Sequence, residues 1–229
     1  MKRGLQIEKS TEILLWVYGV GLAGMLLPFS RNLFITITPL NLIFAALFLF
    51  YRRWPARGVL ITGLAVFTVS FLVEAAGVNS GKIFGSYSYG SALGPKLWNT
   101  PVIIGLNWFV LIYCTNVISR QLWNLLTVSG ANPHVAWKSA FIIITASLLM
   151  VLYDLFLEPA ATRLDMWSWE GGRIPFSNYA AWFLLSGLFH TLVRTTGEEE
   201  VNSRALPLFA VQIGFFAVID IFYLLSDLS

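Results

Sequence analysis

Seven stretches of this sequence are each about as long as a bilayer-spanning helix, nearly free of charge, and bounded by Arg, Lys, Pro or Gly. A helix needs about 20 apolar residues to cross the hydrocarbon core, whereas a membrane-spanning strand is shorter and alternates polar with apolar residues. The stretches show no such alternation, so the sequence predicts helices. The predicted spans are residues 11–27, 33–51, 58–75, 100–119, 136–158, 177–193 and 205–225.

The composition excludes an ordinary soluble domain. Of 229 residues, 57% are hydrophobic and only 12% are charged, whereas about a quarter of a soluble domain is charged. The net charge of +3 is small and the basic residues are scattered at the ends of spans, so we expect no nucleic-acid partner. We expect an all-α fold, a polytopic membrane helical bundle of about seven transmembrane helices that forms a single integral membrane domain over residues 1–229.

Lys and Arg are distributed unequally between the two sides of the predicted spans. One side carries ten: Lys2, Arg3, Lys9, Arg52, Arg53, Arg57, Arg120, Lys138, Arg194 and Arg204. The other carries five: Arg31, Lys82, Lys96, Arg163 and Arg173. Because positive charges in short loops are retained in the cytoplasm, we expect a cytoplasmic N-terminus and place the long loops 76–99 and 159–176 outside.

Four carboxyl side chains fall inside or at the ends of predicted spans: Glu74, Asp154, Glu158 and Asp220. A charge at the centre of a bilayer costs about 2.5–3.5 kcal/mol on insertion scales, so such residues normally face the bundle interior and mark a functional site. The third, fifth and seventh spans run in the same direction, which puts all four acids in one outer layer. Asp154 and Glu158 lie four residues apart and therefore share a helix face.

Simpler explanations remain open for these acids. Glu74 and Glu158 would be solvated or paired with nearby Lys or Arg at the interface, and Asp220 would make a lone polar contact between helices. If the acids are buried at the ends of their helices, desolvation and the helix dipole both favour the neutral, proton-donating carboxyl.

Polar and aromatic side chains lie at the same depth as the acids. Asn107 and Asn178 are placed to hydrogen-bond an acid or a water, or alternatively a neighbouring helix. The Gly-rich loop 76–99 carries Tyr87 and Tyr89, which we expect to fold over an apolar site as a lid. Five tryptophans lie in these regions: Trp98, Trp108, Trp167, Trp169 and Trp182. An interfacial aromatic belt is the expected role for most of them.

Several chemistries have no support in the sequence. His134 and His190 are predicted to lie far apart and away from the acids, and Cys114 is the single cysteine, so we expect no metal site. No GxGxxG, Walker or GxSxG motif occurs, and the seventh span has no lysine that would bind retinal as a Schiff base. We expect no cofactor.

Two stretches together resemble the carotenoid biosynthesis membrane protein family, which includes the CruF-type carotenoid hydratases. The first runs from Glu74 to Tyr89 (EAAGVNSGKIFGSYSY) and continues through Leu93–Lys96, Pro101 and Asn107–Phe109. The second is Asp154–Ala160 (DLFLEPA), followed by Trp167–Trp169 and Pro175–Phe183. The resemblance covers about two thirds of the chain, from the third span through the sixth.

The resemblance implies that water is added across the terminal double bond of an acyclic or monocyclic carotene, in a bacterial or archaeal cytoplasmic membrane. Protonating such an alkene gives a tertiary carbocation, which requires a neutral acid, aromatic faces and a base for the attacking water. The candidate catalytic residues are Asp154, Glu158, Glu74 and Asp220. The candidate substrate-binding residues are Phe84, Tyr87, Tyr89, Asn107, Trp108, Asn178 and Trp182.

The helical spacing of Asp154 and Glu158 favours one of them as the proton donor, with the other, or Glu74, orienting water. Two other functions remain open. An end-group cyclase begins with the same protonation but lets an internal double bond capture the cation, and a carotenoid or lipid binder or a transporter would use the acids without this chemistry.

Overall fold

The computed structural model describes residues 2–52, 55–127, 135–195 and 202–228. The helices in this part of the chain are α1 (Lys2–Leu26), α2 (Arg31–Thr36), α3 (Thr38–Phe50), α4 (Arg57–Ser80), α5 (Ile104–Leu126), α6 (Val135–Arg163), α7 (Phe176–Thr195) and α8 (Ala205–Asp227). Short strands lie between them: β1 (Tyr87–Tyr89), β2 (Lys96–Leu97), β3 (Thr100–Pro101) and β4 (Trp167–Trp169), with a 3-10 turn η1 at Glu170–Gly172. The predicted all-α bundle is confirmed.

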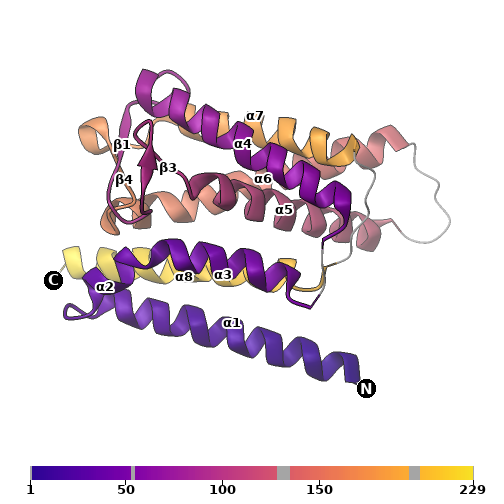
Figure 1. Cartoon of the computed structure of the whole chain (residues 1–229), viewed down its shortest axis with the longest axis horizontal. Coiled ribbons are helices and arrows are strands. Elements are labelled where there is room, and N and C mark those ends of the chain that lie inside the picture. The colour runs from indigo at the N-terminus through magenta and orange to yellow at the C-terminus, as the bar shows by residue number, and fades with distance from the viewer. Residues whose placement is uncertain (1, 53–54, 128–134, 196–201, 229) are drawn as a thin grey trace.

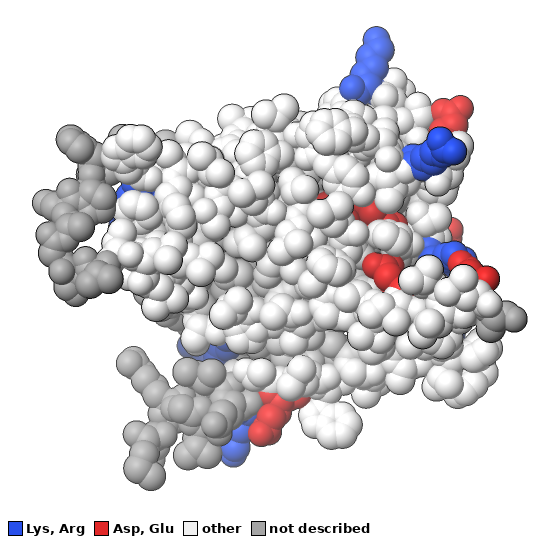
Figure 2. Space-filling model, turned by 180° about the vertical axis from the view of Figure 1, so that it is seen from behind, with Lys and Arg blue, Asp and Glu red and all other residues white. Residues whose placement is uncertain are grey.

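Three of the described helices are long and apolar enough to cross a membrane by length and composition: α4, α6 from Trp137 onward, and α8. Large apolar side chains such as Leu64, Leu148 and Leu184 point out of the bundle. Figure 2 shows a wide central band of one face without Lys or Arg, while the basic residues gather toward the two ends. This surface suits a bilayer and identifies a membrane protein.

Two predicted span boundaries are wrong. The span 33–51 is broken at Ile37 into α2 and α3, because Pro39 in the first turn of α3 has no N–H to continue the helical hydrogen bonding from α2. The span 100–119 begins with β3, so its helix starts only at Ile104.

The third helix continues past the predicted end at residue 75 to Ser80. It ends at Gly81, whose φ of 66° is readily adopted by glycine and whose N–H bonds to the Gly77 carbonyl. Glu74 and Glu158 therefore do not close their helices, and each lies at least one turn before the C-terminus. The dipole at the helix terminus therefore favours the neutral form of these two carboxyls less than the sequence predicts.

The helices form two groups that lie side by side (Figure 1). One group contains α4, α5, α6 and α7, and the other contains α1, α2, α3 and α8, with α8 packed against both α5 and α6. Aromatic rings fill the boundary, where Tyr153 of α6 contacts Phe209 and Phe216 of α8.

The two long loops meet at one end of the bundle. β1 pairs with β4 in antiparallel register, with Tyr87 opposite Trp169 and Tyr89 opposite Trp167. The next turn is held by Asp165, whose carboxylate accepts hydrogen bonds from the N–H and hydroxyl of Ser91 at 2.9 and 2.6 Å. These two bonds lower the pKa of the Asp165 carboxyl.

The chain termini lie at opposite ends of the bundle, and the paired loops share the end that carries the C-terminus (Figure 1). With the basic residues distributed ten to five, we predict that the N-terminus is cytoplasmic and that this loop end is outside. A C-terminal fusion to an enzyme that is active only outside the cytoplasm should be active. A C-terminal reporter that works only in the cytoplasm would contradict the orientation or the odd number of spans.

Candidate functional site

A small cavity, of about 20 Å³, lies among α4, α6, α7 and the β1–β4 pair, next to the loop end of the bundle. Its lining residues are Glu74, Phe84, Tyr87, Tyr89, Ile104, Glu158, Trp167, Trp169, Asn178 and Trp182. We call this space the acid cavity. The strands place Tyr87 and Tyr89 on one face because alternate side chains of a strand point the same way.

Glu74 is buried, at 4% exposed, and is held by three donors. The hydroxyls of Tyr87 and Tyr89 donate to its Oε2 at 2.7 and 2.8 Å. The Trp108 indole donates to its Oε1 at 2.9 Å. Both carboxyl oxygens therefore serve as acceptors, and their orientation is set by a loop and by α5.

Glu158 is held in a similar way, at 1% exposed. The indole N–H groups of Trp167 and Trp169 donate to its Oε2 at 3.0 and 2.6 Å. The Asn178 amide donates to its Oε1 at 3.0 Å. A strand and the start of α7 thus position this carboxyl.

Asp154 lies one turn before Glu158 on α6 and is fully buried. The Asn178 amide that bonds Glu158 also donates to Asp154 Oδ2, at 2.7 Å, so a single side chain bridges the two acids. The other oxygen, Asp154 Oδ1, has no hydrogen-bond partner. An unpartnered buried oxygen is costly for an ionised carboxylate.

The charges in this region are all of one sign. Among the described residues that line the acid cavity there is no Lys, Arg or His. Ionising Glu74, Asp154 and Glu158 together would bring like charges into a desolvated space, so at least one carboxyl has to keep its proton. The arrangement can therefore supply an acid and a base side by side.

The two tyrosines remain hydrogen-bond donors. Burial, followed by the nearby Glu74 carboxyl, raises the pKa of the Tyr87 and Tyr89 hydroxyls well above its ordinary value. Neither hydroxyl ionises near neutral pH, so both can donate to Glu74.

Aromatic faces surround the acids. Trp108 and Trp182 stack with ring centroids 4.5 Å apart, and Tyr87 lies 5.0 Å from Trp169. Aromatic rings attract a cation through the negative charge on their faces. A positive charge that develops in this cavity would thus meet several rings.

The structure brings together most of the residues singled out in the sequence. Glu74, Glu158, Tyr87, Tyr89 and Asn178 line the acid cavity. So do Phe84 and Trp182, while Asp154 and Trp108 hydrogen-bond to cavity-lining residues. The expectation that Glu74 and Glu158 are solvated or paired with Lys or Arg is wrong.

Two predicted residues lie elsewhere. Asp220, on α8, is half-buried and does not line the acid cavity; its Oδ1 has no hydrogen-bond partner. Asn107 is buried against a neighbouring cavity instead. Both miss the acid cavity because depth in the membrane can be estimated from sequence, whereas the direction in which a helix face points depends on packing.

The aromatic belt expected for most of the tryptophans does not describe Trp167 and Trp169, because both donate to Glu158. The signal available in the sequence is their spacing. Two tryptophans two residues apart share one face of a strand, as Tyr87 and Tyr89 do.

Among the described residues, no group of three or more His, Cys, Asp or Glu side chains is arranged to hold a metal ion. His190 is buried with its Nε2 3.3 Å from the Thr115 hydroxyl. His134 lies outside the described residues.

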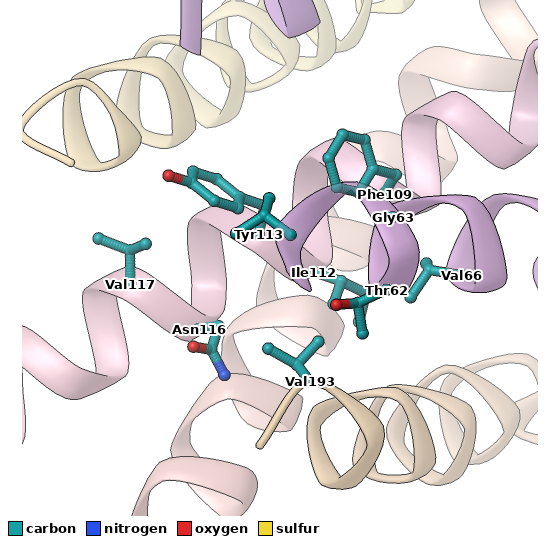
Figure 3. A pocket seen from close by; sticks show the side chains of 10 residues that line it. Thr62, Gly63, Val66, Phe109, Ile112, Tyr113, Asn116, Val117 and Val193 are labelled. Atoms are coloured by element: carbon teal, nitrogen blue, oxygen red, sulfur yellow. The ribbon is translucent and has the colours of Figure 1, made fainter. Parts of the chain in front are cut away.

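A different cavity, of about 30 Å³, lies between α4, α5 and the end of α7 (Figure 3). Its lining is apolar apart from Thr62, Tyr113 and Asn116, and it contains no carboxyl group. On α4, Thr62 lies twelve residues from Glu74, or about 18 Å at 1.5 Å per residue. This cavity therefore offers no carboxyl group for acid–base chemistry.

Comparison with known proteins relates this chain to a protein family. Residues 34–227 match the sequence profile of a family described as carotenoid biosynthesis protein. A stretch of 151 residues, 64% of this chain, is 29% identical to a bisanhydrobacterioruberin hydratase from Haloarcula japonica. The matched stretch spans 47% of that relative, about half of its length. No solved structure matches the chain.

We predict that Tyr87→Phe and Tyr89→Phe each lower the free energy of unfolding, because each removes one donor from the buried Glu74. A hydrogen bond to a charged group is worth about 1.5–3 kcal/mol, and the double variant should lose more than either single one. The measurement is denaturant unfolding in detergent, with Tyr51→Phe, an exposed tyrosine at the other end of the bundle, as the matched control. Equal stability of all four variants would show that these hydroxyls do not support Glu74.

Proposed function

The chain belongs to the carotenoid biosynthesis protein family, and from this premise we propose that it is a hydratase that adds water across the terminal double bond of an acyclic carotene end. The observation that carries the proposal is a cavity in which buried carboxyls face aromatic rings, with no basic lining residue in the described part of the chain. Hydration of an isolated alkene needs these elements: a proton donor, a shelter for the cation, and a base.

In the proposed reaction, Glu158 delivers the proton that it shares with Asp154, because Glu158 lines the cavity and Asp154 does not. Its proton bonds to the less substituted alkene carbon, using the π electrons of the double bond. The other carbon becomes a tertiary cation next to Trp169, Trp182 and Tyr87. Asp154, which shares the Asn178 amide with Glu158, shares a single proton with it in the resting state.

Glu74 acts as the base. Its carboxylate is aimed by three donors, so it can hold the attacking water while remaining ionised. The water oxygen bonds to the tertiary carbon and its surplus proton passes to Glu74. Transfer of that proton back to Glu158 restores the resting state, so that H and OH have been added to the alkene and no cofactor is consumed.

A relative named as a hydratase supports this reaction over cyclisation. A cyclase would use the same donor but exclude water from the cation. In this chain Glu74 lies in the same cavity as Glu158, where it can deprotonate an attacking water.

We predict that Glu158→Gln, Asp154→Asn and Glu74→Gln each reduce hydration. General acid–base catalysis contributes about 10²–10⁴-fold, so Glu158→Gln should lower the rate by that order. Each variant keeps the shape of the side chain but deletes its titrating proton and replaces one accepting oxygen with a donating NH₂ group. The matched control is Glu170→Gln, at an exposed position of η1.

The measurement is the carotenoid product formed in a carotene-producing host, normalised to the amount of protein. Near wild-type hydration by both Asp154→Asn and Glu158→Gln would move the donor to Glu74 or Asp220. Products isomeric with the substrate would identify a cyclase, and an unchanged pigment profile in the presence of wild-type protein would identify a binder.

A further inference from the structure

Two further cavities lie beside the acid cavity. The central cavity, of about 40 Å³, lies between the two helix groups and is lined from α1, α3, α5, α6 and α8. The lateral cavity, of about 480 Å³, lies between α1 and the α2–α3 pair, with Phe215 of α8 at its base. Neither is lined by a charged side chain among the described residues.

The three spaces follow one another and are separated only by side chains that they share. The lateral and central cavities have Tyr18, Met25, Thr38, Asn41 and Phe215 in common. The central and acid cavities have Ile104 and Trp167 in common, and Trp167 donates directly to Glu158. A ligand in the central cavity therefore lies one side chain away from the proposed proton donor.

The lateral cavity opens to the side of the bundle. Its rim residues Trp16, Val20 and Leu40 are 75%, 53% and 61% exposed, although all three are apolar. They lie on helices α1 and α3, within two of the predicted spans, where the surroundings are hydrocarbon. The opening therefore faces lipid tails instead of water.

The lateral cavity is elongated and its lining is mostly apolar. Along α1 alone, the lateral cavity extends from Trp16 to Met25, about 14 Å at 1.5 Å per residue. The central cavity continues it toward the acids, and its polar lining groups are all uncharged: Tyr18, Thr38, Asn41, Asn107, Tyr153 and Gln212. A flexible head group with charge would find no partner along this path.

We propose that the lateral and central cavities bind the polyene chain of the substrate, which enters from the bilayer between α1 and α3 while its reacting end lies in the acid cavity. This inference rests on the proposed function for the identity of the ligand. It assigns a binding role to α1, which lies outside the residues matched by the family profile, and to Asn107 in the central cavity.

Gly21 allows a direct test. It lines the lateral cavity, and a Cβ built there would lie 3.8 Å from Phe215, an ordinary contact distance. Gly21→Phe should therefore fill the cavity without a backbone clash. Gly19→Phe is the matched control, because Gly19 is exposed on the same helix and a Cβ there meets no atom within 4 Å.

Purified full-length variants from a carotene-producing host are compared for bound polyene per protein, by visible absorbance, and for turnover of long and short substrates. Gly21→Phe should retain about tenfold less polyene than Gly19→Phe, which corresponds to about 1.4 kcal/mol. A short isoprenoid alkene with the same terminal group should react equally with both, since it does not reach the lateral cavity. If phenylalanine lowers the protein yield, Gly21→Leu and Gly19→Leu replace the pair.

The outcomes separate this inference from the proposed function. If Gly21→Phe loses polyene and the wild type shows no hydration, the binding path is supported and the proposed hydratase activity is contradicted. If both variants have equal polyene content and equal long-substrate turnover, the binding path is overturned and the proposed hydratase activity is unaffected. The path is also overturned if Gly21→Phe loses bound phospholipid but keeps its polyene, or loses short-substrate turnover as well.

Discussion

The burial of three carboxyl groups within a lipid-embedded bundle is the constraint on which the site depends. An ionised carboxyl in this setting is stabilised by hydrogen-bond donors to its oxygens. Four of these donors come from outside the crossing helices: Tyr87 and Tyr89 bond Glu74, and Trp167 and Trp169 bond Glu158. The loop end is therefore part of the core of the site.

The pairing of β1 with β4 brings hydrogen-bond donors to the buried carboxyls. In the antiparallel register, two tyrosines lie opposite two tryptophans, and the alternation of strand side chains turns all four toward the acids. Asp165 and Ser91 hold the next turn, so the register cannot slip without losing that turn. The side chains that donate these hydrogen bonds also present aromatic faces that attract a cation. The same residues would therefore stabilise the carboxyls and the carbocation of the proposed reaction.

The helices and the common depth of the acids were predictable from the sequence. Hydrophobic runs, and the free energy of placing a charged side chain in lipid, are local properties of the chain. The coupling of Asp154 to Glu158 followed from their spacing, and Asn178 strengthens it as a shared donor. The break at Ile37 and the strand pairing were not predicted, since the pairing joins segments about eighty residues apart. Asp220 was included by depth alone, and only the packing of α8 shows that it lies apart.

The central claim is that a buried carboxyl protonates the alkene and water captures the resulting cation. The most direct measurement is mass spectrometry of the product formed by purified protein from an acyclic carotene, in water enriched in heavy oxygen and separately in heavy water. The account predicts a product that has gained one water, with its oxygen from the solvent and one deuterium bonded to the carbon next to the new alcohol. A product of unchanged mass without solvent oxygen, or no product at all, would contradict it.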